Sequence, residues 1–255
     1  MKVVVVGAHG EMGARVTQIL QARGHRVVPA SRSSGVDAQR GRGLPAGLDG
    51  AHCLVDCLNI TTVRRRRAEQ FFLTTARRLT EAALTAGVGH AVVVGIVNAI
   101  EPEVRGALGY YAGKAVQEET YVASPVPVRV VASTAWFSLA RQFLTQGRLG
   151  PFALVPAMTL QPVHPDAVAV ALADAVEAGP GREKRQLVGP ERLRADAMAR
   201  DLATATGRRV PVVGVPYPGR AFRDHGLLPT GRFTQDERRY ADWLRSSAGG
   251  PGELR

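Results

Sequence analysis

Three glycines near the N-terminus, Gly7, Gly10 and Gly13, lie directly between an apolar run at residues 3–7 and an amphipathic pattern at residues 11–24. The apolar run predicts a buried strand, and the amphipathic pattern predicts a helix that follows it. Gly7 permits a tight turn, Gly10 lets the backbone approach a pyrophosphate, and Gly13 permits close packing of helix on strand. The free N–H groups at the start of the helix attract phosphates. The segment therefore predicts a nucleotide-binding turn, with a glycine-rich turn that binds nothing as the alternative.

The rest of the chain continues this alternation of short apolar runs and longer helical patterns. Further strands are expected at residues 25–31, 53–59, 90–97 and 128–133, and further helices at residues 68–87 and 163–179, with short extended pieces later at QLVGPE and VPVVGVP. Such alternation predicts a parallel sheet with helices on both faces. The expected fold class is therefore α/β, a Rossmann-type doubly wound parallel sheet with a small C-terminal substrate lobe.

The end of the second expected strand indicates which nucleotide is bound. An NAD site usually places a carboxylate there for the ribose 2′-hydroxyl, but no acidic residue occurs between Gly24 and Asp37. The segment instead holds Arg32 between Ser31 and Ser33, and a guanidinium flanked by hydroxyls suits a 2′-phosphate. We therefore expect NADP(H) in preference to NAD(H), with a surface loop that merely carries an arginine as the alternative.

No linker or internal repeat divides the chain, so we expect one NAD(P)-binding domain over residues 1–245. Its core takes about residues 1–135, and its substrate lobe takes about residues 136–245. The tail at residues 246–255 is rich in glycine and serine and is predicted to be disordered.

The formal net charge of +11 comes almost wholly from arginine, since the chain has only three lysines. The basic residues are spread along the chain without a nucleic-acid-binding signature, so no nucleic-acid partner is expected. The run from Arg64 to Arg67 is either a solvated helix start or an anion site. No apolar run reaches the roughly 18 residues that span a bilayer, so no membrane association is expected.

The two cysteines, Cys53 and Cys57, lie four residues apart in an apolar run. In a strand they would be roughly 13 Å apart, too far for a disulfide. Two reduced thiols fit a cytoplasmic protein. Since no cluster of cysteine, histidine and aspartate has the spacing of metal ligands, we expect no metal.

The segment GYYAGKAVQEE, residues 109–119, places Tyr110 four residues before Lys114. Together with the glycine loop, the ASRS turn and the later Gln161-Pro162-Val163, it resembles the atypical short-chain dehydrogenase/reductases. The NmrA-like, NAD(P)H-binding branch is the most similar. The resemblance runs from residue 1 to about residue 245 through AGVGHAVVVGIV, LVGPE and Asp242-Trp243-Leu244, and it is strongest in the first 135 residues.

The resemblance implies that NADP(H) lies across the carboxyl ends of the strands. Tyr110 would be the general acid for a developing alkoxide or enolate, and Lys114 would hold the nicotinamide ribose and lower the pKa of the tyrosine. Asp37 and Ala38 would lie near the adenine, and Leu58 and Asn59 near the adenosine ribose. The cofactor set expected from the sequence and the resemblance comprises Gly7, His9, Gly10, Glu11, Met12, Gly13, Ser31, Arg32, Ser33, Asp37, Leu58, Asn59 and Lys114. The alternative for Tyr110 and Lys114 is simple helix packing.

One position departs from the family pattern. Relatives usually carry a serine at the end of the fifth strand, where this chain has Gly95. Glycine has no hydroxyl for a substrate carbonyl, and losing such a donor typically costs several kcal/mol of transition-state stabilisation. Asn98 could replace the serine, or it could simply cap the loop.

Three further residues are substrate candidates. Trp136 and Phe137 belong to the loop from Ser133 to Phe137, which the resemblance places against the nicotinamide and substrate. They could line a flat pocket or belong to the core. His164 precedes a helix near the expected substrate opening, although a lone histidine is more often structural.

The favoured function is NADPH-dependent reduction of a ketone, an enone or a quinone-type small molecule. A biosynthetic pathway is one setting for such a reaction. A non-catalytic NADP(H)-sensing regulator of the NmrA-like kind is an alternative, to which Gly95 gives weight. A non-redox cyclase, dehydratase or isomerase is another. The sequence leaves open whether the chain is a monomer or a homodimer.

Overall fold

The computed structural model describes residues 1–216, 222 and 226–248. The chain forms two compact units. Unit 1 comprises Met1–Ala132 and Asp166–Arg185, and unit 2 comprises Ser133–Pro165 and Gln186–Arg255. Residues 166–185 fell within the expected C-terminal lobe, but they group with the N-terminal core.

A central sheet carries the fold, and within the described residues it has seven strands in the order β2-β1-β3-β4-β5-β9-β12. Its strands are β1 (Lys2–Val6), β2 (Arg26–Ala30), β3 (Cys53–Asp56), β4 (His90–Ile96), β5 (Val128–Ser133), β9 (Lys184–Val188) and β12 (Thr234–Gln235). β1 pairs in parallel with β2 and β3, and β3 pairs in parallel with β4. Valine-rich strands such as β1 suit this arrangement because both faces of a parallel sheet are covered. The doubly wound α/β fold expected from the sequence is confirmed.

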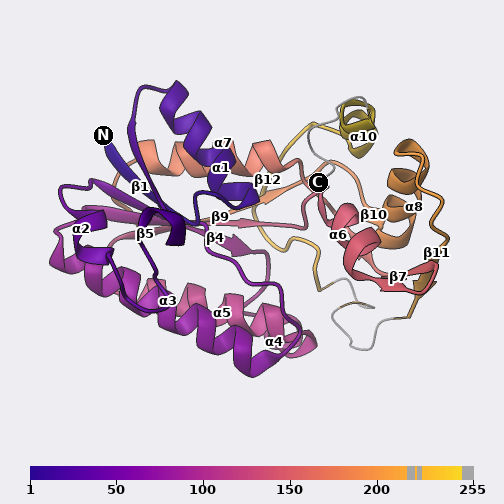
Figure 1. Ribbon diagram of the computed structural model, residues 1–255, viewed down its shortest axis with the longest axis horizontal. Helices are drawn as coiled ribbons and strands as arrows, with labels where there is room; N and C mark the ends of the chain where they lie inside the picture. The colour runs from indigo at the N-terminus through magenta and orange to yellow at the C-terminus, as the bar shows by residue number, and fades with distance from the viewer. Residues whose placement is uncertain (217–221, 223–225, 249–255) are drawn as a thin grey trace. The chain divides into compact units, whose positions relative to one another are not determined.

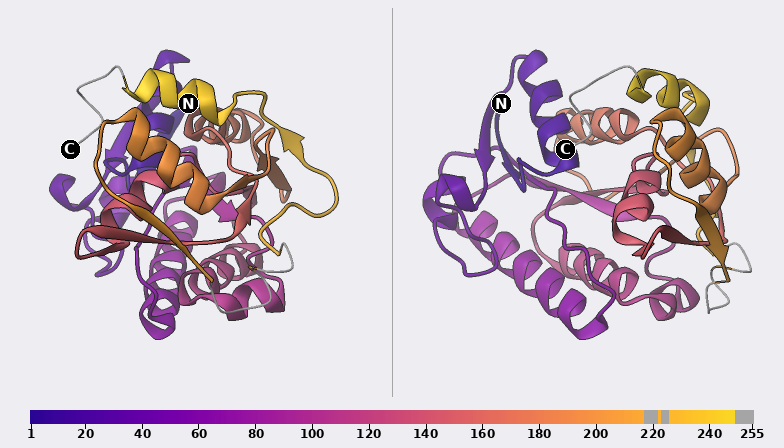
Figure 2. Two further views of the ribbon diagram at one scale, coloured as in Figure 1. Left: turned by 90° about the vertical axis from the view of Figure 1, so that its right-hand side faces the viewer. Right: turned by 45° about the vertical axis from the view of Figure 1, so that its right-hand side comes forward.

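Helices cover both faces of the sheet in unit 1, as the layers in Figures 1 and 2 show. One face carries α1 (Glu11–Ala22) and α7 (Pro165–Glu177), and the other carries α3 (Arg65–Thr85), α4 (Pro102–Ala107) and α5 (Gly109–Ala123). Two short elements complete the unit, the 3-10 helix η1 (Arg32–Ser34) and α2 (Leu44–Leu48). The strands and long helices predicted from the apolar periodicity thus form, with ends that differ by a few residues.

Two glycines of the GYYAGK segment bring α5 close to α3. A Cβ placed on Gly109 would lie 2.4 Å from the backbone nitrogen of Arg65, and one placed on Gly113 would lie 2.6 Å from Cδ2 of Phe72. Real Cβ atoms do not come so close, so neither position accepts a larger residue without a shift of α3. The segment that holds Tyr110 therefore also sets the distance between two helices.

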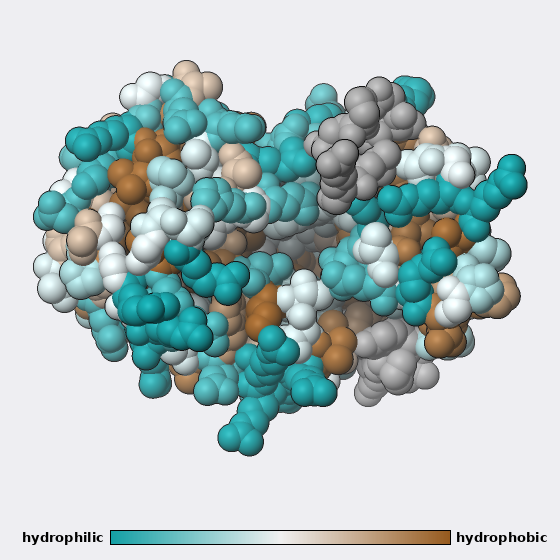
Figure 3. Space-filling model, viewed as in Figure 1, coloured by the Kyte–Doolittle hydropathy of each residue, from teal (hydrophilic) through white to brown (hydrophobic). Residues whose placement is uncertain are grey.

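The arginine run begins α3. Arg64 is the N-cap residue, Arg65 to Arg67 form the first turn, and all four side chains are exposed. Arg65 makes an ion pair with Glu69 at 2.9 Å, one turn further along the helix. Figure 3 shows hydrophilic residues over much of the face it presents.

Unit 2 is built from short strands and three described helices. The strands are β6 (Arg148–Leu149), β7 (Phe152–Pro156), β8 (Thr159–Leu160), β10 (Leu193–Arg194) and β11 (Val212–Val215). The helices are α6 (Leu139–Gln146), α8 (Ala195–Ala205) and α10 (Tyr240–Ala248). Strands β11, β7 and β6 form one small sheet, and β10 and β8 form another. β12 pairs with β9 through Leu187 and Val188.

The C-terminal tail differs in part from its prediction. Residues 246–248 were expected to be disordered, but they form the last turn of α10. Tyr240 and Trp243 anchor this helix in unit 2, because both rings pack near Phe137, with centroids 5.4 and 6.0 Å away, and the hydroxyl of Tyr240 donates to the carbonyl of Met198 at 2.8 Å. The rest of the predicted tail, residues 249–255, lies outside the described residues. None of the described helices combines the length and the apolar character needed to cross a membrane.

Candidate functional site

The strand order creates a switch point between β1 and β3. The chain leaves β1 toward β2 on one side, and β3 to β5 follow on the other side. In open α/β sheets, ligands bind outside the carboxyl ends of the strands at such a point. The glycine loop after β1 and the residues after β3 therefore form the candidate site.

The glycine loop is held tightly against its neighbours. Gly7 has φ of +77°, and a Cβ there would lie 2.9 Å from the carbonyl group of Cys57. A Cβ on Gly13 would lie 2.1 Å from the carbonyl oxygen of Gly7. The N–H of Gly10 donates to that same oxygen at 2.9 Å, and Gly10 is the N-cap residue of α1. This geometry supplies a close turn and a helix N-terminus that faces outward, the two features a pyrophosphate requires.

The turn after β2 meets the glycine loop. Nδ1 of His9 lies 3.2 Å from Oγ of Ser33, which in turn lies 2.8 Å from Oγ of Ser31. Ser34 holds the turn in shape, since its hydroxyl donates to the carbonyl of Ser31 and accepts the N–H of the same residue. The side chain of Arg32 is exposed at the start of η1. Of the other loop residues in the expected cofactor set, Glu11 is exposed and Met12 is buried.

Asp37 has partners within its own loop. The buried carboxylate accepts hydrogen bonds from the backbone and side chain of Arg40 and makes an ion pair with Arg42. Burial alone would raise its pKa, but the hydrogen bonds and charge of Arg40 outweigh that effect and lower it. The neighbouring Ala38 is buried in the core. An adenine contact for this pair stays a prediction.

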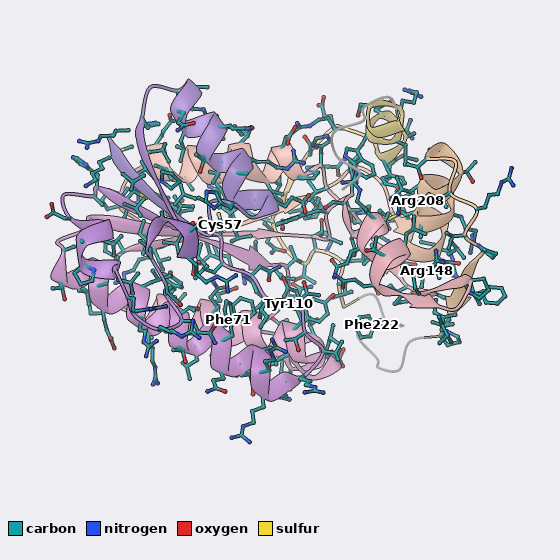
Figure 4. The ribbon with its side chains drawn as sticks, viewed as in Figure 1. Cys57, Phe71, Tyr110, Arg148, Arg208 and Phe222 are labelled. Carbon is teal, nitrogen blue, oxygen red and sulfur yellow. The ribbon has the colours of Figure 1, made fainter. Side chains whose placement is uncertain are left out.

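The segment after β3 links the glycine loop to the GYYAGK helix. Cys57 contacts Gly7 through its backbone, and the N–H of Leu58 donates to Asp56 at 2.9 Å. The side chain of the next residue, Asn59, lies near enough to the phenol of Tyr110 to lower the pKa of that hydroxyl. Figure 4 shows Tyr110 on α5 and Cys57 at the end of β3.

Tyr110 is half-buried at the start of α5. Its ring packs edge-on against Phe72 of α3, with the centroids 6.1 Å apart, and lies 5.8 Å from the ring of Tyr111. Burial raises the pKa of its hydroxyl to about 12, against the smaller lowering effect of the nearby Asn59 side chain. The expected lowering of this pKa by Lys114 stays a prediction.

Lys114 is a residue of α5, and its side chain is buried. Its ammonium group donates to the carbonyl of Val94 at 2.6 Å and to the side-chain oxygen of Gln117, and it lies 5.0 Å from the ring centre of Phe72. Burial lowers its pKa to about 8, although the nearby carboxylate of Asp56 acts in the opposite direction.

Gly95 lies in β4 where a serine was expected from the family pattern. A Cβ on Gly95 would lie 2.9 Å from Cγ1 of Val130, so a serine needs a shift in the neighbouring strand. Asn98, the suggested replacement, is buried in the turn after β4 with φ of +57°. Its backbone carbonyl accepts the N–H of Glu101, so its backbone forms part of this turn, and a substrate contact for its side chain stays a prediction.

The three substrate candidates of the lobe all lie in unit 2. Phe137 is buried there, and its ring packs against Tyr240 and His164 with centroids 5.4 and 5.7 Å away. These contacts match the core alternative for Phe137 and a packing role for His164. Trp136 is half-buried and donates its indole N–H to Ser133 at 2.8 Å.

Three polar residues near the candidate lysine were not predicted from the sequence. Asp56 ends β3, and Gln117 and Tyr121 lie on α5, where both donate to the Asp56 carboxylate. Burial raises the pKa of Asp56, and the hydrogen bonds and the charge of Lys114 oppose that rise. The spacing of residues 114, 117 and 121 places them on one helix face and was a usable signal.

Within the described ranges, no group of three or more histidine, cysteine, aspartate or glutamate side chains is placed to hold a metal ion. Cys53 and Cys57 are free, buried thiols.

Several solved structures with a similar architecture were crystallised with nicotinamide dinucleotides. The dTDP-4-dehydrorhamnose reductase of Bacillus anthracis in complex with NADP has a TM-score of 0.68 and 14% identity, covering 96% of this chain and 97% of that chain. The UDP-glucose 4-epimerase of Thermus thermophilus in complex with NAD has a TM-score of 0.71 and 17% identity, covering 97% and 98%. A short-chain dehydrogenase/reductase superfamily protein of Agrobacterium tumefaciens with bound NAD has a TM-score of 0.65 and 17% identity, covering 97% and 96%.

These likenesses establish the fold. At this level of identity they do not fix the substrate, and the bound nucleotides include both NADP and NAD. No protein-family model matches the chain, and no curated protein sequence matches it.

Proposed function

We propose that the chain is an NADP(H)-dependent oxidoreductase that reduces a ketone, an enone or a quinone-type small molecule. One observation carries the proposal, the short connection between the glycine loop and the phenol of Tyr110. The backbone of Cys57 takes the space that a Cβ on Gly7 would need, and the side chain of Asn59, two residues later, lies near enough to the phenol of Tyr110 to lower its pKa. A candidate proton donor therefore lies at the edge of the sheet where a dinucleotide would bind.

The chain's own residues would bind the cofactor and move one proton. The glycine loop and the N-terminus of α1 would hold the pyrophosphate, and Arg32 with its flanking serines would hold the 2′-phosphate. Bound NADPH would supply a hydride to the substrate carbon. Tyr110 would give its phenolic proton to the substrate oxygen, and the ammonium of Lys114 would bind the nicotinamide ribose. The proposal also includes a cytoplasmic location, a small-molecule substrate and membership of the NmrA-like branch.

The preference for NADP(H) over NAD(H) rests on charge at the end of β2. Arg32 is exposed there, and the only carboxylate nearby in sequence, Asp37, is engaged by Arg40. A free carboxylate for a ribose 2′-hydroxyl is thus missing from this described turn, whereas a guanidinium is present.

A second candidate is an NADP(H)-sensing regulator without turnover. Two observations favour it: Gly95 supplies no hydroxyl for a substrate carbonyl, and the ammonium of Lys114 is bound by Val94 and Gln117. In a sensor the same site would bind the nucleotide, and Tyr110 would have only a packing role.

Two measurements test the proposal. Calorimetric titration with NADPH, NADP⁺ and NADH should give tight binding of the phosphorylated cofactors and much weaker binding of NADH. NADPH consumption should then be followed with a panel of ketones, enones and quinones. Tyr110→Phe should lower any rate about 100-fold or more with little change in NADPH affinity, since a general acid contributes that much.

Tyr111→Phe is the matched control, because Tyr111 is the next residue and lies roughly 100° away around the helix. Equal rates in Tyr110→Phe and the wild type would support the sensor. If none of the three nucleotides binds the wild type, both the oxidoreductase and the sensor proposals are wrong.

A further inference from the structure

The face of α5 that packs on the sheet carries polar residues where an apolar stripe is usual. Lys114, Gln117, Glu118 and Tyr121 occupy this face, and each is at most 5% exposed. Burying such groups is costly unless each finds a partner. The arrangement of those partners indicates what the face does.

Gln117 joins two buried charges of opposite sign. Its side-chain oxygen accepts from the ammonium of Lys114, and its nitrogen donates to Asp56 Oδ2 at 2.8 Å. An amide can do both at once, because it carries an acceptor oxygen and a donor nitrogen on one carbon. The charges on either side therefore fix which way the amide points.

Asp56 is itself held in place from two further directions. Tyr121 donates to its Oδ2 at 3.0 Å, and the backbone N–H of Leu58 donates to its Oδ1 at 2.9 Å. Leu58 follows the residue whose backbone contacts Gly7. A continuous series of contacts thus runs from the glycine loop through Asp56 and Gln117 to the ammonium of Lys114.

The ammonium of Lys114 has three N–H donors. In the described part of the chain, Val94 and Gln117 take two of them, which fixes the direction of the third. A ligand hydroxyl at the carboxyl edge of the sheet could take this remaining donor. Asp56, Cys57 and Glu118 are the titratable groups that act on the ammonium, and Glu118 is also paired with Lys184 at 2.6 Å.

We infer that Gln117 is a positioning residue, which with Asp56 holds the ammonium of Lys114 so that its third N–H points at the cofactor ribose. The cofactor half of this inference rests on the proposed function. The contact between Gln117 and Lys114 can be tested separately, with no nucleotide present.

The low lysine content makes a direct test practical. The chain has only Lys2, Lys114 and Lys184, so ¹³C-labelled lysine gives three Cε resonances, assigned with Lys2→Arg and Lys184→Arg. Gln117→Met removes the acceptor and should move the titration of Lys114 to lower pH. Gln117→Glu adds a negative charge and should move it to higher pH. Thr75→Val is the control, because among the described residues the hydroxyl of Thr75 bonds only to carbonyls of its own helix, those of Phe71 and Phe72.

NADP⁺ binding by calorimetry tests the cofactor half. Gln117→Met should weaken binding about tenfold, as expected when a charged hydrogen bond is misaligned, and Thr75→Val should leave it unchanged. An unchanged Lys114 titration in both Gln117 variants would overturn the inference. A shifted titration with unchanged NADP⁺ affinity would overturn its cofactor half alone.

If the wild type binds no NADP⁺, the proposed function and the cofactor half are wrong, and the lysine titration still decides the positioning of Lys114. If Gln117→Met does not fold, Gln117→Glu decides the outcome, since it keeps the shape of the side chain.

Discussion

Nδ1 of His9 lies 3.2 Å from Oγ of Ser33, so the glycine loop after β1 and the turn after β2 meet at one corner of unit 1. Two segments that, under the proposed function, would hold the pyrophosphate and the 2′-phosphate are thereby placed side by side. Arg32 stands at this corner with its side chain exposed. Its charge is available to an anionic ligand.

The first prediction concerns that charge. Arg32→Ala should weaken NADPH binding by a factor of ten or more and leave NADH binding nearly unchanged, because only NADPH carries the 2′-phosphate. Arg26→Ala is the control, since Arg26 is an exposed arginine at the opposite end of the same strand. Calorimetry with both cofactors measures the effect. An equal loss for NADPH and NADH would contradict a role for Arg32 in selectivity.

The second prediction concerns the fit of α1 against the glycine loop. In Gly13→Ala the new methyl group would lie 2.1 Å from the carbonyl oxygen of Gly7, so the loop must move. We expect a loss of about 1–3 kcal/mol in the free energy of unfolding, together with weaker cofactor binding. Gly106→Ala, where nothing lies within 4 Å of the added Cβ, should be neutral or slightly stabilising. Equal stability of the two variants in urea would contradict the close packing.

The third prediction concerns the missing serine. Gly95→Ser should not restore a more active enzyme, because its Cβ would lie 2.9 Å from Cγ1 of Val130. It should instead lower the free energy of unfolding by about 1–3 kcal/mol. In a Val130→Ala background, Gly95→Ser should lower the free energy of unfolding by less than it does in the wild type. A faster and equally stable Gly95→Ser protein would show that the strand accepts the side chain.

The fourth prediction concerns pH. Burial raises the pKa of both thiols, Cys53 and Cys57, far above the usual value of 9.0. Above pH 9 the unfolded chain therefore releases thiol protons that the folded chain keeps. The free energy of unfolding should fall as the pH rises past 9, by up to about 1.4 kcal/mol per pH unit for each thiol.

The double variant Cys53→Ala/Cys57→Ala isolates this thiol effect. Its free energy of unfolding should decline less steeply than that of the wild type in urea titrations between pH 8 and 10.5. Parallel declines in the two proteins would mean that the thiols are not protected. A thiol reagent at pH 8 should likewise leave both cysteines of the folded wild type unmodified.

Local sequence patterns predicted most of unit 1, and long-range contacts explain what they did not predict. A valine run such as Val3–Val6 carries its own strand signal, and the spacing of Gly7 and Gly13 carries the turn. The inward position of Lys114 depends instead on Asp56, which is 58 residues earlier in the sequence. The grouping of residues 166–185 with unit 1 likewise depends on which surface α7 covers, and periodicity does not record that surface.

Unit 1 is assembled from two separate stretches of the chain, Met1–Ala132 and Asp166–Arg185. During synthesis, the ribosome therefore makes residues 133–165, which belong to unit 2, before it makes the helix α7 that covers part of the first sheet. Buried residues of α7 such as Val168 and Leu172 are not yet available to the nascent sheet. A chain stalled before residue 166 exposes an apolar face, and that face is the natural target of chaperones that act on nascent proteins.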